Sequence, residues 1–278
     1  MIKQVSKYIS LFVSLLIVVL VLSGCSASKF IPEGKFLLDD AEIKSDVKDV
    51  NPDRLKAYIR QKGNSKWFSL FKIPLGTYAL SGKDSTKWIN KKLRDLGEDP
   101  VLFDSLQTAM TCSDLENVLH GLGYLRATVD YNLDFKKKKK VVVVYNLHPG
   151  PLYHISSVSY DIQDDKIAEF LNTGEEGGFK PGLRVGMPFL TNELDNERKA
   201  LTKYLNNNGY YKFHKDFITY SADSVRGSTD VGLTLHLHKY TANSKSPEEA
   251  HTRYKINDVT YYSNDERNYV PLRQSVLE

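Results

Sequence analysis

The sequence has no large excess of charge of either sign and, after its first residues, no long apolar run. Its 38 lysines and arginines stand against 34 aspartates and glutamates, which gives a net charge of +4. Without the first 24 residues, which carry Lys3 and Lys7 and no acid, 36 basic residues remain against 34 acidic ones. So weak a bias does not indicate nucleic-acid binding. No later stretch could cross a membrane as a helix, which needs about 20 apolar residues.

The sequence also lacks recognisable catalytic and metal-binding patterns. His236 and His238 share one face of a predicted strand, and His214 could approach from the paired strand. No carboxylate or cysteine completes a zinc site there by spacing. The glycine-rich stretch 173–182 lacks the Gly-Lys-Ser/Thr ending of a phosphate-binding loop. The sequence therefore predicts a protein that is not an enzyme and holds no metal or dissociable cofactor.

Cysteine is scarce, and one of the two cysteines lies in a recognisable position. Lys3 and Lys7 precede an apolar segment, residues 9–22, which is short for a spanning helix and typical of a signal-peptide core. The segment runs into VLSGC, which resembles the lipobox of bacterial lipoproteins. This resemblance implies cleavage between Gly24 and Cys25, with a diacylglycerol thioether and an N-acyl chain such as palmitate on Cys25. A plain signal peptide with an incidental cysteine is the alternative.

The second cysteine, Cys112, has no cysteine left to pair with if Cys25 carries lipid, so no disulfide is expected. It lies in TAMTCSDLENVLHGLGY, a stretch typical of the start of a helix. We expect Cys112 to be a small buried apolar side chain rather than a nucleophile.

An internal repeat organises the rest of the chain. A helical segment ends at a Gly-Tyr step at Gly123 and again at Gly209, and glycine suits the left-handed turn that ends a helix. Each step is followed by two runs of alternating apolar residues, which predict an antiparallel hairpin with one buried face. The inward positions are Ala127, Val129, Tyr131, Leu133, Phe135, Val141, Val143, Tyr145 and Leu147 in the first copy, and Tyr211, Phe213, Phe217, Val231, Leu233, Leu235 and Leu237 in the second.

Strands and helices in front of each hairpin complete the unit. Opening strands are predicted from Gly34, from Leu152 and, for a third copy, from Arg253, where Ile256 and Val259 fit the pattern. Helices are predicted over 51–63 (capped by Asn51, with Pro52 in the first turn), 108–124, 164–172 and 187–209. The order strand-helix-helix-strand-strand predicts an α+β fold with a three-stranded mixed sheet and two helices on one face.

That order, the Gly-Tyr step and the tandem arrangement resemble POTRA (polypeptide-transport-associated) domains of outer-membrane assembly proteins of the BamA/TamA type. An insertion in the first unit contains IPLGTYAL and GEDPVLFD, which resemble the first module of TamL, the lipoprotein form of TamA in the Bacteroidetes. KFIPEGKFLL and HPGPLY are similar to that form too. The resemblance implies a signal peptide over 1–24, a lipidated tether over 25–35, a first module over 36–149 with its insertion over about 63–104, a second module over 150–241, a linker over 242–252 and the start of a third module over 253–278. Family members continue into a C-terminal β-barrel that this sequence does not contain, so we expect a fragment or a shortened product.

The resemblance implies that such modules work through their backbone rather than through catalytic side chains. The first strand of the closing hairpin lies at a sheet edge, where it can accept an extended client or partner strand. This strand is expected over Leu125–Phe135 in the first unit and over Tyr210–Ser221 in the second. The candidate binding residues of the second unit are Tyr210, Tyr211, Lys212, Phe213, His214, Lys215, Asp216 and Phe217. An ordinary edge protected by the charges of Lys212, Lys215 and Asp216 is the alternative.

The implied location is the outer membrane, with the lipid on Cys25 as anchor and the modules facing the periplasm. Ser26 follows the lipidated cysteine and the next acid is Glu33, which by similarity to lipoprotein sorting rules favours outer-membrane retention. The implied partners are unfolded outer-membrane protein clients and a periplasmic partner of the TamB type, and not nucleic acid. A stand-alone periplasmic scaffold lipoprotein without a barrel and a lipid-anchored hydrolase are the rival functions.

Two further features each have two interpretations. The run Lys136–Lys140 joins two strands and is either a solvated hairpin turn or a contact for anionic headgroups. Four aromatic residues of the insertion either pack onto the first unit or form a docking patch: Trp67, Phe68, Phe71 and Tyr78.

Overall fold

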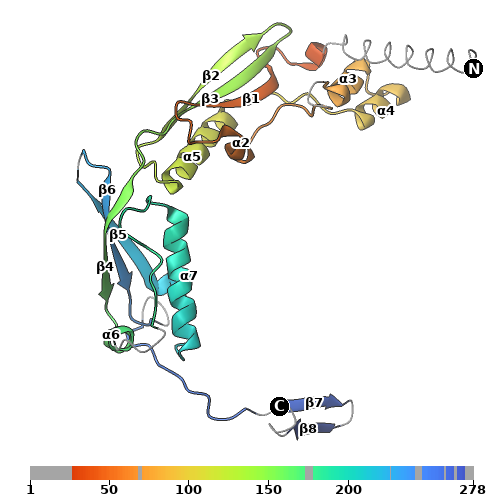
Figure 1. Ribbon diagram of the computed structural model, residues 1–278. Helices are drawn as coiled ribbons and strands as arrows, with labels where there is room; N and C mark the ends of the chain where they lie inside the picture. Colours follow the sequence, from red (N-terminus) through yellow and green to blue (C-terminus); the bar gives the residue numbers. More distant parts are fainter. Residues whose placement is uncertain are drawn as a thin grey trace, which may run out of the picture. The chain divides into compact units, whose positions relative to one another are not determined.

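The computed structural model describes residues 27–67, 71–172, 178–225, 227–241, 246–259, 261–265 and 268–272. The chain divides into two compact units, Met1–Leu152 (unit 1) and Tyr153–Glu278 (unit 2), and each holds a three-stranded sheet (Figure 1). The predicted cleavage and lipid sites, Gly24 and Cys25, lie outside the described residues, as does Phe68. The domain boundaries given above stay predictions.

Unit 1 contains the predicted order of elements with two additional helices inside it. Its elements are η1 (Ala27–Phe30), β1 (Leu37–Ser45), α2 (Pro52–Leu55), η2 (Lys56–Tyr58), α3 (Ile73–Leu80), α4 (Trp88–Leu96), α5 (Ser105–Gly121), β2 (Thr128–Lys136) and β3 (Lys140–His148). Strand β3 is central, parallel to β1 and antiparallel to β2. The helices α3 and α4 fall within the predicted insertion, and α5 lies along the sheet (Figure 1).

Unit 2 repeats this order without the additional helices. Its elements are β4 (His154–Ile162), α6 (Asp165–Asn172), α7 (Thr191–Asn207), η3 (Lys215–Phe217), β5 (Ile218–Ser224) and β6 (Asp230–Leu237), followed by an antiparallel pair, β7 (Tyr261–Asp265) and β8 (Asn268–Leu272). Strand β6 is central, parallel to β4 and antiparallel to β5, and α7 lies alongside the sheet (Figure 1). The same topology therefore occurs twice in the described part of the chain.

Each central strand has one fully buried face, as its alternating residues predict. The buried residues are Val141, Val143, Tyr145 and Leu147 in β3, and Val231, Leu233, Leu235 and Leu237 in β6. Leu115 and Leu119 of α5 belong to the core of unit 1, and Leu201 and Leu205 of α7 belong to that of unit 2. The predicted α+β fold, with a mixed sheet and helices in each unit, is confirmed.

The Gly-Tyr step ends α5 and α7 in the same way. Tyr124 N donates to Leu119 O and Gly123 N donates to His120 O, both at 3.0 Å. These two bonds define the Schellman motif, which places a left-handed residue just after the helix. The same pair of bonds ends α7 at Gly209, and the two glycines have φ values of +91° and +95°.

After β6 the chain turns back and is held on unit 2 by its own main chain. We call residues 249–254 the return segment. Its main-chain contacts are the antiparallel bridge between Tyr240 and Glu249, the bond from His251 N to Asp164 Oδ2 (2.6 Å) and the bond from Tyr254 N to Gly209 O (2.8 Å). The residues that precede β7 are thus part of the folded unit up to Tyr254.

Replacing Gly209 by alanine is expected to destabilise unit 2 and to release the end of the return segment. The left-handed conformation costs a residue with a side chain about 1–2 kcal/mol, and the added Cβ would lie 2.4 Å from Tyr254 O. Gly186→Ala is the matched control, because Gly186 has φ +87° and nothing within 4 Å of an added Cβ. Urea unfolding should show the larger loss for Gly209→Ala, and amide exchange at Tyr254 should rise in that variant alone. Equal losses would contradict a stabilising contact between Gly209 and the return segment.

The first predicted helix is wrong in length although its start is confirmed. Asn51 caps α2 by accepting from Asp53 N (2.9 Å), and Pro52 is the first residue. The α-helix then ends at Leu55 and continues as η2 only to Tyr58, instead of reaching Gly63. At Gly63 the chain lies so close to β1 that a Cβ would be 2.6 Å from Asp39 O. Packing against the strand therefore overrides local helix propensity.

The predicted opening strand of a third unit is also wrong in position. Residues 251–259 form no strand, and the side chains of Ile256 and Val259 are exposed. Strand β7 begins only at Tyr261 and pairs with β8. In units 1 and 2 the opening strand pairs in parallel with the closing strand of its own unit, whereas β7 pairs with β8 in antiparallel.

Candidate functional site

The outer edge of each opening strand is partly covered by the chain's own backbone. Residues 101–103 in unit 1 and 186–189 in unit 2 lie against the first residues of β1 and β4. The bonds are Leu38 N to Val101 O and Phe103 N to Phe36 O in unit 1, and Ile155 N to Met187 O and Phe189 N to Tyr153 O in unit 2, all at 2.8–2.9 Å. The other edge of each sheet, β2 or β5, has no second strand partner in the part of the chain that the structure describes.

The pairing of β5 with β6 determines which amides of β5 point outward. His238 N donates to Phe217 O. Phe217 and every second residue of β5 after it therefore form their main-chain hydrogen bonds with β6. The outward N–H groups therefore belong to Ile218, Tyr220, Ala222 and Ser224. Ile218 N is already bonded to Lys215 O, which leaves the last three as the open part of the edge.

Strand β2 presents its edge in the same manner but is more heavily charged. Val129 N donates to Glu116 Oε1 (2.9 Å), so the next outward amides are those of Tyr131, Leu133 and Phe135. The solvent face of β2 carries Asp130, Asp134 and Lys136, whereas that of β5 carries only Asp223. Charges on an edge strand discourage pairing with another strand. The edge of β5 is therefore the better candidate for binding a strand.

The eight candidate residues 210–217 do not lie on that strand, so the predicted start of the edge is wrong. The strand begins at Ile218, and the chain before it forms a turn in which Phe213 N donates to Tyr210 O (2.8 Å), followed by η3. Tyr210 and Phe213 are buried in the core, while Tyr211, predicted to point inward, is 59% exposed. In unit 1 the strand likewise begins at Thr128, three residues after the predicted start at Leu125.

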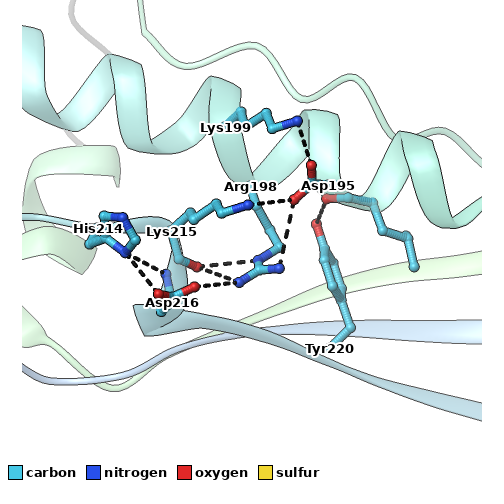
Figure 2. A network of polar contacts seen from close by, with 8 residues as sticks. Asp195, Arg198, Lys199, His214, Lys215, Asp216 and Tyr220 are labelled. Carbon is cyan, nitrogen blue, oxygen red and sulfur yellow. Dashed lines mark hydrogen bonds and ion pairs between the residues drawn. The ribbon is translucent and has the colours of Figure 1, made fainter.

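The residues just before β5 are held on α7 by a polar network (Figure 2). Asp195 accepts from Lys199 (2.5 Å) and Lys215 (3.3 Å), and their hydrogen bonds hold the pKa of this carboxyl below its usual value. The Arg198 guanidinium donates to Lys215 O at 2.9 and 3.2 Å. Tyr220, the first open edge residue, donates its hydroxyl to a main-chain oxygen of α7 (3.2 Å). The network holds the residues that lead into β5 in place and does not form a reactive centre.

His214 lies in this segment and not on the edge. Its Nδ1 accepts from Asp216 N (3.5 Å), which caps η3, and its side chain is exposed. A proline at His214 would therefore remove no edge donor. The binding role of residues 210–217 stays a prediction, whereas their assignment to a strand is corrected.

The two strand histidines are occupied by hydrogen bonds on the solvent face of β6. His236 lies 2.8 Å from both Asp161 Oδ2 and Ser221 Oγ, and His238 lies 2.8 Å from Thr219 Oγ1. Among the described residues, no group of three or more His, Cys, Asp or Glu side chains could hold a metal ion.

Cys112 lies on α5 and is buried, as predicted. Burial raises the pKa of its thiol to about 11, with smaller contributions from Glu116 and Asp130. The thiol is therefore protonated near neutral pH, and a protonated thiol is a poor nucleophile.

Asp164 connects α6 with the return segment, a contact for which the sequence contains no signal. Its Oδ1 caps α6 by accepting from Lys166 N (3.1 Å) and Ile167 N (3.2 Å), and its Oδ2 accepts from His251 N and His251 Nδ1 (2.9 Å). Burial opposes ionisation of Asp164, but these hydrogen bonds outweigh it and place its pKa below the usual value. One carboxylate thus satisfies four donors inside unit 2.

His251 lies beside a cavity of about 200 Å³ that is lined by the turn at Tyr210–Phe213 and the return segment. Its Nε2 is buried and has no hydrogen-bond partner among the described residues. Burial lowers the pKa of His251, although the neighbouring Asp164 acts in the opposite direction. The ring is therefore held neutral, with Nδ1 as the proton-bearing nitrogen.

Unit 2 is expected to lose stability as the pH falls below about 6.5. The unfolded chain binds a proton on His251 near its ordinary pKa of 6.5, whereas the folded chain does so only at lower pH. The contribution is present above pH 6.5 and is lost as the pH falls through the lowered pKa of the folded state. Urea unfolding at a series of pH values measures it. The variant His251→Phe should have a shallower decline between pH 6.5 and 5, and an unchanged decline would contradict this role of His251.

No helix in the described ranges has both the length and the apolar character needed to span a membrane.

The chain was compared with protein-family models, curated sequences and solved structures. No family model and no curated protein matches it. POTRA domains 3–5 of BamA from Haemophilus influenzae are similar in structure, with 14% identity over 81% of this chain and 82% of that chain and a TM-score of 0.39. POTRA domains 1–2 of Omp85 from Anabaena match with 13% identity over 76% of this chain and 100% of that chain, at a TM-score of 0.33. CdiB from Escherichia coli matches with 6% identity over 84% of this chain and 34% of that chain, at a TM-score of 0.28. All three scores are low, so no function follows from these similarities.

Proposed function

We propose that units 1 and 2 are periplasmic POTRA modules of a lipid-anchored outer-membrane assembly factor of the TamA/BamA type. In this role the chain binds extended segments of outer-membrane protein clients, or of a periplasmic partner of the TamB type, and performs no chemistry on them. The sequence resemblance, the repeated strand-helix-helix-strand-strand order and the lipobox at Cys25 support the proposal. Lipid on Cys25 would keep the modules at the inner surface of the outer membrane.

The observation that carries the proposal is the open edge of β5. Its outward amides at Tyr220, Ala222 and Ser224 have no strand partner among the described residues, while the start of β4 is covered by residues 186–189. An added strand would gain main-chain hydrogen bonds that do not depend on its sequence. Such tolerance suits a protein whose clients have many different sequences.

Ala222→Pro tests this edge, because it removes an outward N–H group without touching a bond to β6. Proline is tolerated in an edge strand when its nitrogen faces solvent. We expect unchanged folding and about a ten-fold loss of strand binding, since each main-chain bond contributes about 0.5–1.5 kcal/mol and the ring also blocks the pairing. Binding can be measured with the full chain carrying a photocrosslinker at the exposed Asp223 and a labelled peptide of alternating apolar and polar residues.

Ser221→Pro is the matched control, because the N–H group of Ser221 points toward β6. This variant should lose a bond of the ladder and unfold at lower urea concentration. Full crosslinking by a folded Ala222→Pro chain would contradict strand binding at β5.

A further inference from the structure

The helix α4 is attached to the rest of unit 1 by its polar side. The Arg94 guanidinium donates to Ser81 Oγ (3.2 Å) and Gly82 O (2.8 Å) and lies over the ring of Phe30. The Asn90 side chain accepts from Gly82 N (2.8 Å) and donates to Asp84 O (2.7 Å). The side of the helix that carries Asn90 and Arg94 therefore faces the protein.

The apolar side of α4 faces outward. Trp88 is 72% exposed, Ile89 52% and Leu96 68%, and no residue of the helix is fully buried. At 100° per residue these three side chains and Lys92 occupy one continuous arc of the helix. A surface helix of a globular protein normally has the opposite arrangement, with its apolar stripe toward the core.

The surroundings of this face are basic. Between Ser81 and Gly97 five basic residues stand against two acidic ones, in a chain whose net charge is only +4. Arg94 is engaged as described above. The ammonium groups of the other four have no ion-pair or hydrogen-bond partner among the residues that the structure describes: Lys83, Lys87, Lys91 and Lys92.

The first described residues of the chain are fixed next to α4. Ala27 is buried in one cluster with Leu75 and Ala79 of α3, and Lys29 Nζ donates to Ser81 O (2.7 Å). Phe30 contacts the ring of Tyr78 at a centroid distance of 5.0 Å. The tether expected over 25–35 is thus docked from Ala27 onward. Because Cys25 precedes Ala27 by two residues, the chain allows at most about 8 Å between their Cα atoms.

We propose that α4 lies in the headgroup region of an anionic phospholipid leaflet and thereby orients unit 1 on the membrane. The proposal deepens the proposed function and rests on it for the anchor at Cys25. An amphipathic helix binds a membrane surface when basic residues flank an apolar face that contains tryptophan. Here Trp88, Ile89 and Leu96 would enter the boundary with the acyl chains. Lys92, in the same arc, would extend its ammonium group back to the lipid phosphates, which the other three free lysines would also contact. Acyl chains on Cys25 would enter the same leaflet close to this helix.

The charge pattern favours a membrane over a protein as the occupant of this face. A protein interface typically has few charges at its centre and is depleted in lysine. Here the unpaired Lys92 lies within the arc, Lys91 lies on the same helix, and Lys83 and Lys87 come just before it. A lipid anchor already supplies affinity, so α4 need only set the orientation of the unit. Its nine residues are sufficient for that task, although a helix of this length alone would bind a membrane weakly.

The experiment uses the native processed chain with Trp67→Phe, which leaves Trp88 as the only tryptophan. The protein is placed in vesicles of phosphatidylcholine and phosphatidylglycerol, with or without bromine on the acyl chains. We expect a blue shift and about a two-fold quenching of Trp88 by the brominated lipids, since interfacial helices enter by about 5–10 Å. Quenching should weaken in pure phosphatidylcholine and at high salt. The mass of the N-terminal peptide reports separately whether Cys25 carries lipid.

Ile89→Ser with Leu96→Ser should abolish the quenching, and Leu106→Ser is the matched control. Leu106 is 65% exposed but lies on α5, outside the apolar arc, so its replacement should leave the quenching unchanged. Both variants change only exposed side chains and are expected to fold.

The possible outcomes separate this proposal from the proposed function. Quenching of Trp88 supports membrane docking by α4, whether or not Cys25 proves to be lipidated. Absence of quenching with lipid present on Cys25 overturns the docking and leaves the anchor intact, and a protein would then be the occupant of this face. Absence of both quenching and lipid overturns the docking and the anchor together. Equal quenching of Trp88 in Leu106→Ser and in the Ile89/Leu96 variant would also overturn membrane docking by α4.

Discussion

Replacing Asp164 by alanine is expected to lower the free energy of unfolding of unit 2 by about 3 kcal/mol. The carboxylate is fully buried and accepts from Lys166 N, Ile167 N, His251 N and His251 Nδ1. Alanine would leave buried donors without partners, and each such donor costs about 1–3 kcal/mol. It would also remove the cap of α6, which typically contributes about 1 kcal/mol. Some of this cost is recovered as the freed groups reach water, so the effects should not add in full.

Urea unfolding monitored by circular dichroism measures the loss of unfolding free energy. Asp165→Ala is the matched control. Asp165 is the next residue and is exposed, so its replacement should change the free energy of unfolding by less than about 0.5 kcal/mol. The loss of unfolding free energy in Asp164→Asn should lie between those of Asp164→Ala and Asp165→Ala. The asparagine keeps one oxygen for the cap of α6 but turns its NH2 group toward the donors of His251. Similar losses for Asp164→Ala and Asp165→Ala would contradict the connecting role of Asp164.

Replacing Leu119 by alanine is expected to destabilise unit 1 by about 3 kcal/mol, within the range of about 2–5 kcal/mol for buried leucines. Leu119 is fully buried in the cluster that includes Ile59 and Tyr145. These neighbours come from the chain after η2 and from the central strand β3, so the cavity would open between layers that cannot easily collapse. Alanine keeps the helix and the main-chain bonds of the Schellman motif, and the loss should therefore come from packing alone.

Leu122→Ala provides the comparison for this prediction. Leu122 lies three residues further on α5, at its C-cap, and its side chain is exposed. Its replacement should cost well under about 1 kcal/mol. Thermal unfolding of both variants would distinguish them, and a loss at Leu122 as large as that at Leu119 would contradict the assignment of the core.

The repeated architecture could be predicted because local signals and tertiary structure agree in it. The alternation of Val141, Val143 and Tyr145 matches a strand with one buried face, and packing against α5 requires that face. Gly123 and Gly209 stand where a Schellman motif needs a left-handed residue. Period-two and helix-end signals therefore sufficed for the sheet order and for the helices α5 and α7.

The start of the edge strand could not be predicted, because residues 210–217 imitate a strand. Phe213 and Phe217 are spaced as alternating inward residues would be, yet a turn at Tyr210 brings Phe213 into the core. Contacts with α7, above all Arg198 to Lys215 O, then fix η3 in place. These contacts join residues 17 apart in sequence and have no local signature.

The Asp164–His251 contact and the orientation of α4 were also hidden from the sequence. The bond between Asp164 and His251 spans 87 residues, and neither residue lies in a recognisable motif. The alternation of apolar and basic residues in α4 predicts an amphipathic helix but not which side meets the protein. Asn90 and Arg94 decide that by binding Gly82, and only the folded insertion reveals it.

The return segment gives unit 2 a defined response to mechanical force. A pull on the chain after Tyr254 would load its bond to Gly209 first. The contacts of His251 and then of Glu249 would be loaded afterwards, so the three contacts would break in sequence. With the segment docked, six residues (255–260) span the distance to β7, a reach of about 20 Å. Once it is undocked, His238 stays bonded to Phe217 O, and the 22 residues from 239 to 260 could extend by at most about 75 Å. The sheet of unit 2 would thus be shielded from tension by a stretch of chain that lengthens before any strand is pulled.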